Sequence, residues 1–287
     1  MLPSTGALTR FASDANCQNR TTISIIIANS HGDEALERCV ESLTTKTNYP
    51  NYEILIVQSD NSSGARLVLS RFPHRLLQFS GAPNDSAAKN YAAKESDAPW
   101  LLFLDDTVEI VDPEWLTIMA EHVQRPEVGA VGARLLNPSG TVEHAGIVVG
   151  VNGNCTAGLC GFPAEHPGTN RQLQVTRNCS AVSSACMLTR RGGFRAGWGF
   201  DESLSGALAD VDLCLKIRRA GYLIVYTPFA RLYWHATHSE KTDTSGDAIL
   251  RQRWANVLER DPYYNPNLSR ERADFSLGKY EATIESK

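Results

Sequence analysis

The sequence of 287 residues lacks two features of membrane and nucleic-acid-binding proteins, because it has no long apolar run and no block of basic residues. No apolar segment approaches the roughly 20 residues of a membrane-spanning helix, and residues 1–20 lack the apolar core of a secretory signal. The 28 basic and 32 acidic residues give a formal net charge of −4, so nucleic acid is not an expected partner. We therefore expect a cytoplasmic protein without a transmembrane segment. Any peripheral association with the cytoplasmic face of the inner membrane would depend on another component.

Cysteine is also sparse, and its distribution excludes two kinds of structure. The seven cysteines stand at positions 17, 39, 155, 160, 179, 186 and 214. An odd, dispersed set does not form a disulfide framework and fits a reducing compartment. Cys155 and Cys160 are the nearest pair, but a zinc site needs a second tight pair, which the sequence lacks. We expect ordinary buried or surface thiols.

What the sequence does contain is a regular alternation of strand and helix signals in its first 105 residues. Largely apolar runs predict strands at 23–27, 53–57, 76–79 and 100–104, and the first of them is also rich in β-branched residues. Helices are predicted after a cap at Asp33, over 66–72, and after a cap at Asn84. This order predicts an α/β fold with a parallel sheet and right-handed crossovers. A dinucleotide oxidoreductase would share it, but only Gly32 follows the first strand, without the Gly-x-Gly-x-x-Gly turn.

Polar loops follow three of these strands, at 28–32, 58–63 and 105–109. Ligands of open α/β sheets bind beyond the carboxyl ends of the strands. The sequence therefore predicts a nucleotide pocket at this edge of the sheet.

The second half of the chain is less regular. The pattern predicts a helix beginning at 112–116 with Pro113 in its first turn, and strands within 128–150. It then predicts a long working loop at 151–177, a strand at 185–189, a helix opened by Asp210-Val211-Asp212 and ended by Gly221, a strand at 223–226, and a final helix at 246–260.

Acidic residues are the strongest chemical signal. Asp105 and Asp106 repel each other unless a cation compensates them, and Mg²⁺ typically uses one or two carboxylates plus substrate oxygens. The alternative is that Asp106 caps the next turn. Asp210 and Asp212 can equally be explained as caps of their helix. His235 follows two aromatic residues, a setting more typical of a packed histidine than of a ligand. The aromatic rings of 198–202 could stack on a sugar or pack in the core.

Taken in order, these segments resemble the family 2 glycosyltransferases with the GT-A fold, over roughly residues 22–240. The closest resemblance is to bacterial enzymes that build O-antigen, capsule or related surface polysaccharides, including rhamnosyltransferase-like members. The most specific stretch runs from Gly199-Phe200-Asp201-Glu202 to Asp210-Val211-Asp212-Leu213-Cys214-Leu215. The segments that carry the resemblance are 24–27, 39–43, 49–54, 102–106, 112–116, 129–136, 143–146, 199–202, 210–215 and 221–222.

The resemblance implies a Rossmann-like, mostly parallel central sheet flanked by helices, with a smaller acceptor-side region. It implies an arm at 1–20, a nucleotide-sugar-binding half at 21–108, an acceptor-binding and catalytic half at 109–240, and a C-terminal helix and tail at 241–287. The implied reaction is inverting transfer of a hexosyl or rhamnosyl unit. The donor would be a UDP-, dTDP- or GDP-sugar, and the acceptor a glycan or lipid-linked glycan.

The resemblance also implies roles for individual residues. Asp210 would be the general base that accepts the proton of the acceptor hydroxyl. Asp106 and His235 would hold Mn²⁺ or Mg²⁺. The residues implied to bind the nucleotide sugar are Ala28, Asn29, Ser30, Gln58, Asp60, Lys89, Asp105, Asp106 and Arg134. Those implied to border the acceptor and the donor sugar are Trp198, Gly199, Phe200 and Asp201.

Several positions depart from the family pattern, among them Ala209, Ala236 and Trp198, and two of them bear on the function. Thr107 stands where an ungapped match expects the last aspartate of the metal motif, and Gln58 stands where an acid usually meets the base. They favour an alternative function, a non-catalytic transferase-like domain that binds a nucleotide sugar or a glycan.

Overall fold

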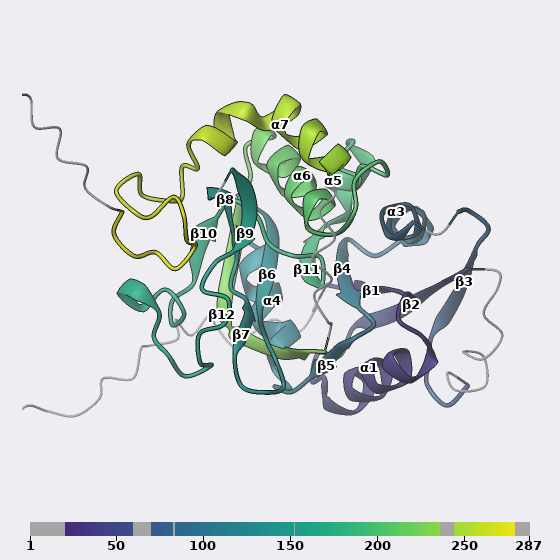
Figure 1. The fold of residues 1–287 in the computed structure, drawn as a ribbon. Coiled ribbons are helices and arrows are strands. Elements are labelled where there is room, and N and C mark those ends of the chain that lie inside the picture. Colours follow the sequence, from purple (N-terminus) through teal and green to yellow (C-terminus); the bar gives the residue numbers. More distant parts are fainter. Residues whose placement is uncertain (1–20, 60–69, 83, 152, 236–243, 279–287) are drawn as a thin grey trace, which may run out of the picture.

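A ten-stranded mixed sheet forms the centre of the computed structural model, which describes residues 21–59, 70–82, 84–151, 153–235 and 244–278 (Figure 1). Its strand order is β10-β12-β6-β11-β4-β1-β2-β3, with β5 paired to β12 and β7 paired to β6. The strands are β1 (Ile23–Ala28), β2 (Tyr52–Ser59), β3 (Arg75–Phe79), β4 (Trp100–Asp105), β5 (Val108–Ile110), β6 (Val128–Leu136), β7 (Val142–His144), β10 (Arg177–Cys179), β11 (Cys186–Arg190) and β12 (Leu223–Trp234). A separate hairpin pairs β8 (Ile147–Val151) with β9 (Asn154–Ala157).

Parallel pairing brings the carboxyl ends of three strands to one edge. Strand β1 lies between β2 and β4 and is parallel to both. In this register Ala28 lies opposite both Val57 and Asp105. Strand β11 then runs antiparallel between β4 and β6, so its first residue, Cys186, lies opposite Leu104 near the end of β4. The predicted mostly parallel α/β sheet is confirmed, and the strands β1, β2 and β4 that precede the polar loops end at a common edge.

Helices cover both faces of the sheet (Figure 1). They are α1 (Asp33–Lys46), α3 (Asp85–Glu95), α4 (Trp115–Val123), α5 (Arg191–Arg195), α6 (Gly206–Arg219) and α7 (Thr244–Glu259), with a short 3₁₀ turn η1 (Thr169–Arg171). Alternate side chains of a strand point to opposite faces. Accordingly, Ile26 packs in the core beneath α3 and α6, whereas Ile25 and Ile27 pack in the core beneath α1 and α4. Helix α7 lies over α6.

Several element boundaries differ from the sequence-based prediction. Helix α6 begins at Gly206, with Ser205 at its N-cap position, so Asp210 lies inside the helix and does not open it. At α1 the cap position is held by Gly32, without a side-chain cap bond, and Asp33 is the first helical residue. The Asn84 cap of α3 is confirmed, because its side chain accepts a hydrogen bond from the Ala87 N–H.

Other differences concern where the predicted helices, strands and loops begin and end. Helix α4 begins at Trp115, so Pro113 precedes it rather than occupying its first turn. Strand β12 continues to Trp234, because its apolar pattern runs on after a change of register. The segment predicted as a loop at 151–177 contains β9 and η1. The predicted arm at 1–20 and residues 66–69 of the predicted helix at 66–72 lie outside the described residues, and residues 70–72 form a turn and a bend rather than a helix. The last helix is confirmed at Thr244–Glu259.

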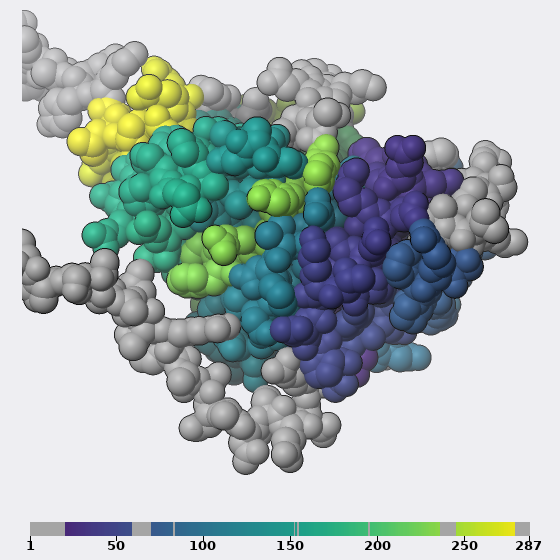
Figure 2. Space-filling view, turned by 90° about the horizontal axis from the view of Figure 1, so that it is seen from below, coloured from purple at the N-terminus to yellow at the C-terminus, as the bar shows by residue number. Residues whose placement is uncertain are grey.

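The two predicted halves of the chain share the same sheet, since β4 of the first half pairs with β11 of the second. Figure 2 shows the purple N-terminal segments and the teal segments of the second half side by side on one face. Their assignment to donor and acceptor remains a prediction. The six described cysteines are free thiols. Of the described helices, none has both the length and the apolarity to cross a membrane.

Candidate active site

The loop after β1 is bound to the end of β4 through Asp106. This carboxylate is 1% exposed, and its Oδ2 accepts hydrogen bonds from the backbone N–H groups of Ser30 at 2.7 Å and His31 at 2.8 Å. Its Oδ1 lies 2.6 Å from Nδ1 of His31. Burial raises the pKa of Asp106, although the bonds from His31 and Ser30 oppose the rise. Burial acts against a charged His31, but its bond to Asp106 and the surrounding carboxylates outweigh burial and raise the pKa of His31.

Asp105 is oriented by Thr107. Its Oδ1 accepts hydrogen bonds from the Thr107 N–H at 2.9 Å and from the Thr107 hydroxyl. Its backbone N–H donates to the carbonyl of Ala185 at 3.0 Å, which ties it to the segment before β11. Thr107 therefore fixes the neighbouring carboxylate where the family pattern led us to expect another acid.

The same segment before β11 holds Asp210. The Oδ2 atom of Asp210 accepts hydrogen bonds from the Ser184 N–H at 2.9 Å and from the Ser183 hydroxyl at 3.1 Å. Asp210 is 5% exposed. Ser183 and Ser184 thus bind the carboxylate of Asp210, and the carbonyl of the next residue, Ala185, accepts a hydrogen bond from the backbone N–H of Asp105. The predicted meeting of the sheet edge and the later helix is confirmed.

Lys89 of α3 completes this group. Its buried ammonium donates to Asp85 at 2.5 Å and to the Ser184 hydroxyl at 2.9 Å. Burial opposes the charged form of Lys89, but Asp85 and Asp210 outweigh burial and raise its pKa. Burial raises the pKa of Asp210, and the charge of Lys89 opposes that rise. Lys89 thus binds the same segment as Asp210, and its positive charge acts on the Asp210 carboxylate, the candidate base.

The sequence predicted Asp106 and His235 as metal ligands, but the structure groups Asp106 with other residues. Within the described residues, one group of side chains could hold a metal ion, with ligand atoms of His31, Asp105 and Asp106 all within 4.8 Å of one another. The imidazole Nε2 of His235 instead lies 3.0 Å from the carboxylate of Glu109. Its backbone N–H donates to the Thr107 carbonyl at 3.1 Å, so the residue remains beside the acidic edge.

The other predicted nucleotide-sugar residues fall into three groups. Ala28, Asn29 and Ser30 form the end of β1 and the loop after it, and Gln58 is buried near the end of β2. Asp60 lies outside the described residues. The buried Arg134 donates to the carbonyls of Leu173 and Ala164, so its guanidinium joins the two ends of the segment 164–173.

The residues predicted to border the sugars are mostly packed. Trp198 is buried with its ring 5.0 Å from that of Tyr222 in an edge-on contact, and Phe200 is buried with its ring 4.9 Å from that of Phe103. Both rings thus pack in the core, and their contact with a sugar remains a prediction. Gly199 lies between them with its carbonyl bound to Lys216.

Asp201 differs from its neighbours because its carboxylate reaches the surface. It accepts hydrogen bonds from Ser203 and from Arg253, the latter at 2.8 Å. These bonds, those from Ser203 above all, lower the pKa of Asp201 to about 2. Its predicted contact with the acceptor remains a prediction.

Sequence reasoning did not select four residues of this site. His31 lies in a loop that was predicted to bind the ligand, so its position was visible in the sequence. Asp85 stands four residues before Lys89, the spacing of a helical ion pair, which the structure shows. Ser183 and Ser184 carry no local signal, because their role depends on α6 packing against the start of β11.

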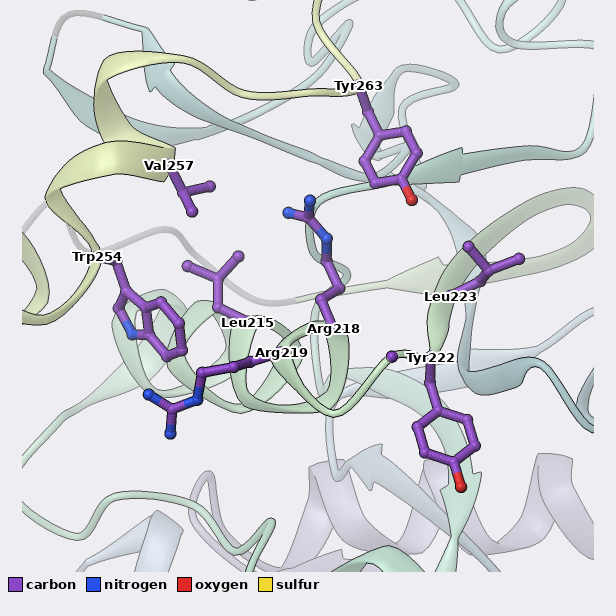
Figure 3. A pocket seen from close by; sticks show the side chains of 9 residues that line it. Leu215, Arg218, Arg219, Tyr222, Leu223, Trp254, Val257 and Tyr263 are labelled. Carbon is purple, nitrogen blue, oxygen red and sulfur yellow. The ribbon is translucent and has the colours of Figure 1, made fainter.

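A hollow of about 420 Å³ lies apart from this group, toward the C-terminal end of α6 (Figure 3). Figure 3 shows Arg218 extending toward Tyr263, and the guanidinium carbon lies 4.8 Å from the ring centre. Arg219 lies 5.0 Å from the ring of Trp254. The hollow therefore marks the junction of α6 with α7 and the segment after α7.

Comparison with known proteins gives relatives over most of the chain. Uncharacterized protein y4gI of Sinorhizobium fredii is 37% identical over 283 residues, which cover 92% of this chain and 31% of that protein. O-antigen biosynthesis protein RfbC of Myxococcus xanthus is 35% identical over 268 residues, covering 90% and 21%. The N-acetylglucosaminyl-diphospho-decaprenol L-rhamnosyltransferase of Mycobacterium tuberculosis is 29% identical over 249 residues, covering 79% and 80%. The chain thus spans under a third of the first two relatives.

Solved structures share the fold. A mannosyltransferase of Pyrobaculum calidifontis in complex with GDP-Man and Mn²⁺ matches 78% of this chain and 59% of its own, with a TM-score of 0.59 and 14% identity. GalNAc-T7 with UDP, GalNAc and Mn²⁺ matches 84% and 49%, with a TM-score of 0.66 and 14% identity. They confirm the expected GT-A fold.

The model of Glycosyl transferase family 2 matches residues 23–198. Since these residues make up more than half of the sequence, the chain belongs to glycosyltransferase family 2.

Proposed function

We propose that this domain transfers a hexosyl or rhamnosyl unit from a nucleotide-diphosphate sugar to a hydroxyl of a glycan or lipid-linked glycan, with inversion at the anomeric carbon. The observation that carries the proposal is the contact of both acidic regions with one segment, 183–185. The Mycobacterium tuberculosis relative is named as a rhamnosyltransferase with a lipid-linked substrate, which supports this class of donor and acceptor.

The proposed chemistry divides between the two regions. The loop after β1 would line the nucleotide, and a divalent cation at Asp105 and Asp106 would supply charge to stabilise the leaving diphosphate. Asp210 would accept the proton of the acceptor hydroxyl as that oxygen attacks the anomeric carbon from the opposite face. Ser183 and Ser184 orient this carboxylate, and their bonds to its Oδ2 leave Oδ1 for the proton.

The proposal is tested with the purified chain and a panel of UDP-, GDP- and dTDP-sugars, with and without Mn²⁺. A donor at 100 times its Kd should stabilise the folded state by about 2.7 kcal/mol in thermal unfolding. The donor that binds is then incubated with lipid-linked and free glycan acceptors. Binding followed by transfer or donor hydrolysis supports the enzyme. Binding without either, at every acceptor tested, favours the non-catalytic domain.

Lys89→Met is expected to move the pH dependence of transfer toward higher pH. The charge of Lys89 lowers the pKa of Asp210 against the effect of burial, so the variant's base has a higher pKa. A base acts only when it is deprotonated. As the pH is lowered, the variant should therefore lose transfer activity at a higher pH than the wild type does. The acid limb of kcat/KM against pH should therefore shift upward, with a larger loss near pH 6 than near pH 8.

Lys94→Met is the matched control, because Lys94 is an exposed residue of the same helix. It should leave the pH profile unchanged. Circular dichroism establishes that both variants are folded. An equal loss of activity at all pH values in Lys89→Met would show that Lys89 does not control the ionisation of Asp210.

A further inference from the structure

The proposed reaction uses a divalent cation held by Asp105 and Asp106. The other two positions that the sequence indicated, Thr107 and His235, do not supply a third side-chain ligand. Thr107 donates its hydroxyl hydrogen to Asp105, which commits it to orienting that carboxylate. The imidazole of His235 lies 3.0 Å from the carboxylate of Glu109. Asp105 and Asp106 are then the remaining ligands from the predicted set.

His31 supplies the missing ligand type at the right place. A ring nitrogen of His31, a carboxylate oxygen of Asp105 and one of Asp106 lie within 4.8 Å of one another. The His31 side chain is 48% exposed, whereas that of Asp106 is 1% exposed. One side of the group therefore faces solvent, as a cation that also binds phosphate oxygens and water requires.

A hydrogen bond that merely anchors the loop does not explain the position of His31. The loop is already held by two backbone N–H groups, of Ser30 and His31, which bind Oδ2 of Asp106. The imidazole is directed at the other oxygen, Oδ1. The Asp106 and Asp105 carboxylates lie beside His31, and the negative charge of Asp85 also acts on it. A divalent cation would offset this concentration of negative charge.

We propose that His31 is a ligand of the divalent cation used by this domain, together with Asp105 and Asp106, an inference that rests on the proposed function for the presence of the cation. The chemistry of the ligands sets the choice of metal. Mg²⁺ prefers oxygen ligands, whereas imidazole suits transition metals. A site with one imidazole and two carboxylates should therefore prefer Mn²⁺ to Mg²⁺, and should lose that preference without His31.

The experiment measures Mn²⁺ binding to the whole chain in the absence of any donor. Pulsed electron paramagnetic resonance detects the nitrogen of an imidazole bound directly to Mn²⁺, and titration gives the Kd. The wild type should show the nitrogen coupling. His31→Ala should lose the coupling and bind Mn²⁺ at least about tenfold more weakly, the lower range seen for loss of a residue that supports a metal ligand. Competition with Mg²⁺ should show a smaller change for Mg²⁺.

His235→Ala is the matched control, since His235 is the histidine that the sequence indicated. It should retain both the nitrogen coupling and the Mn²⁺ affinity. His31→Gln keeps a polar side chain beside Asp106 but offers no imidazole, so it should behave as His31→Ala does.

Three results would overturn the proposal. They are a nitrogen coupling that persists in His31→Ala, its disappearance in His235→Ala with His31 intact, and the absence of Mn²⁺ binding by the folded wild type. A failure of the proposed function gives a different result, in which the His31-dependent coupling is present but no donor is bound, hydrolysed or transferred.

Discussion

Asp210→Asn is expected to slow transfer by about 10²–10⁴-fold, the range that general base catalysis contributes. Asparagine keeps the size of the side chain and an oxygen that can accept the bonds from Ser183 and Ser184, but it cannot take the proton of the acceptor hydroxyl. Donor affinity should change little, because the proposed nucleotide contacts lie at the ends of β1, β2 and β4. Steady-state kinetics with a saturating donor and a separate measurement of donor Kd check both statements.

Asp210→Glu provides the comparison, because it retains the carboxylate and moves it by one methylene. A displacement of about 1 Å can cost about 10²-fold in rate, so this variant should retain more activity than Asp210→Asn. If Asp210→Asn turns over within a factor of ten of the wild type, or if Asp210→Glu is the slower of the two, Asp210 is not the base.

Asp212→Ala is expected to destabilise the fold by on the order of 3–5 kcal/mol without a direct effect on the proposed chemistry. Asp212 is completely buried and points away from Asp210. It accepts hydrogen bonds from Arg253 at 2.7 Å and from the Trp254 indole at 2.9 Å, and lies 2.7 Å from the Lys216 ammonium. Its removal leaves the buried indole N–H of Trp254 without an acceptor and removes the polar contacts that join α7 to α6. Urea unfolding at pH 7 measures the loss.

Asp201→Ala is the control for that experiment, because Asp201 binds the same Arg253 at the surface. Exposed ion pairs contribute about 0–1 kcal/mol, so the loss should be much smaller. The pH matters for the comparison. A lowered pKa stabilises the folded state above the ordinary pKa of an aspartate, and that stability is lost as the pH falls toward about 2. At pH 7 Asp201 makes its full contribution, and equal losses in the two variants would contradict the expected dominance of the buried carboxylate.

The central strands of the sheet could be predicted from the sequence because runs of apolar residues mark them locally. The runs at 23–27 and 100–104 are almost entirely apolar, and polar residues follow them, which indicates both the buried strands and the edge where the candidate site lies. Asn84 was visible as a cap for the same local reason. The start of α6 was missed because Asp210 and Asp212 have the residue type of a helix cap, although tertiary partners explain both.

The partners of the site residues could not be predicted, because they depend on contacts between distant segments. His31 and Asp106 are 75 positions apart, and Lys89 and Ser184 are 95 positions apart. Lys89 was selected as a nucleotide-binding residue, and its burial beside Ser184 became apparent only when α3 and β11 were seen together. His235 was selected for the metal, and its pairing with Glu109 follows from the register of β12 against β5.

The segment 183–185 has a consequence for how relatives of this domain can diverge. Strand β11 begins at the next residue and is hydrogen-bonded on both sides, to β4 and β6, so these three residues cannot shift without disturbing the interior of the molecule. In the proposed reaction, the distance between Asp210 as the base and the leaving diphosphate would therefore be set by the central sheet and not by surface loops. Chimeras that exchange the outer segments between related enzymes, while keeping this strand and its neighbours from one parent, should change which sugars are joined and preserve the stereochemical course.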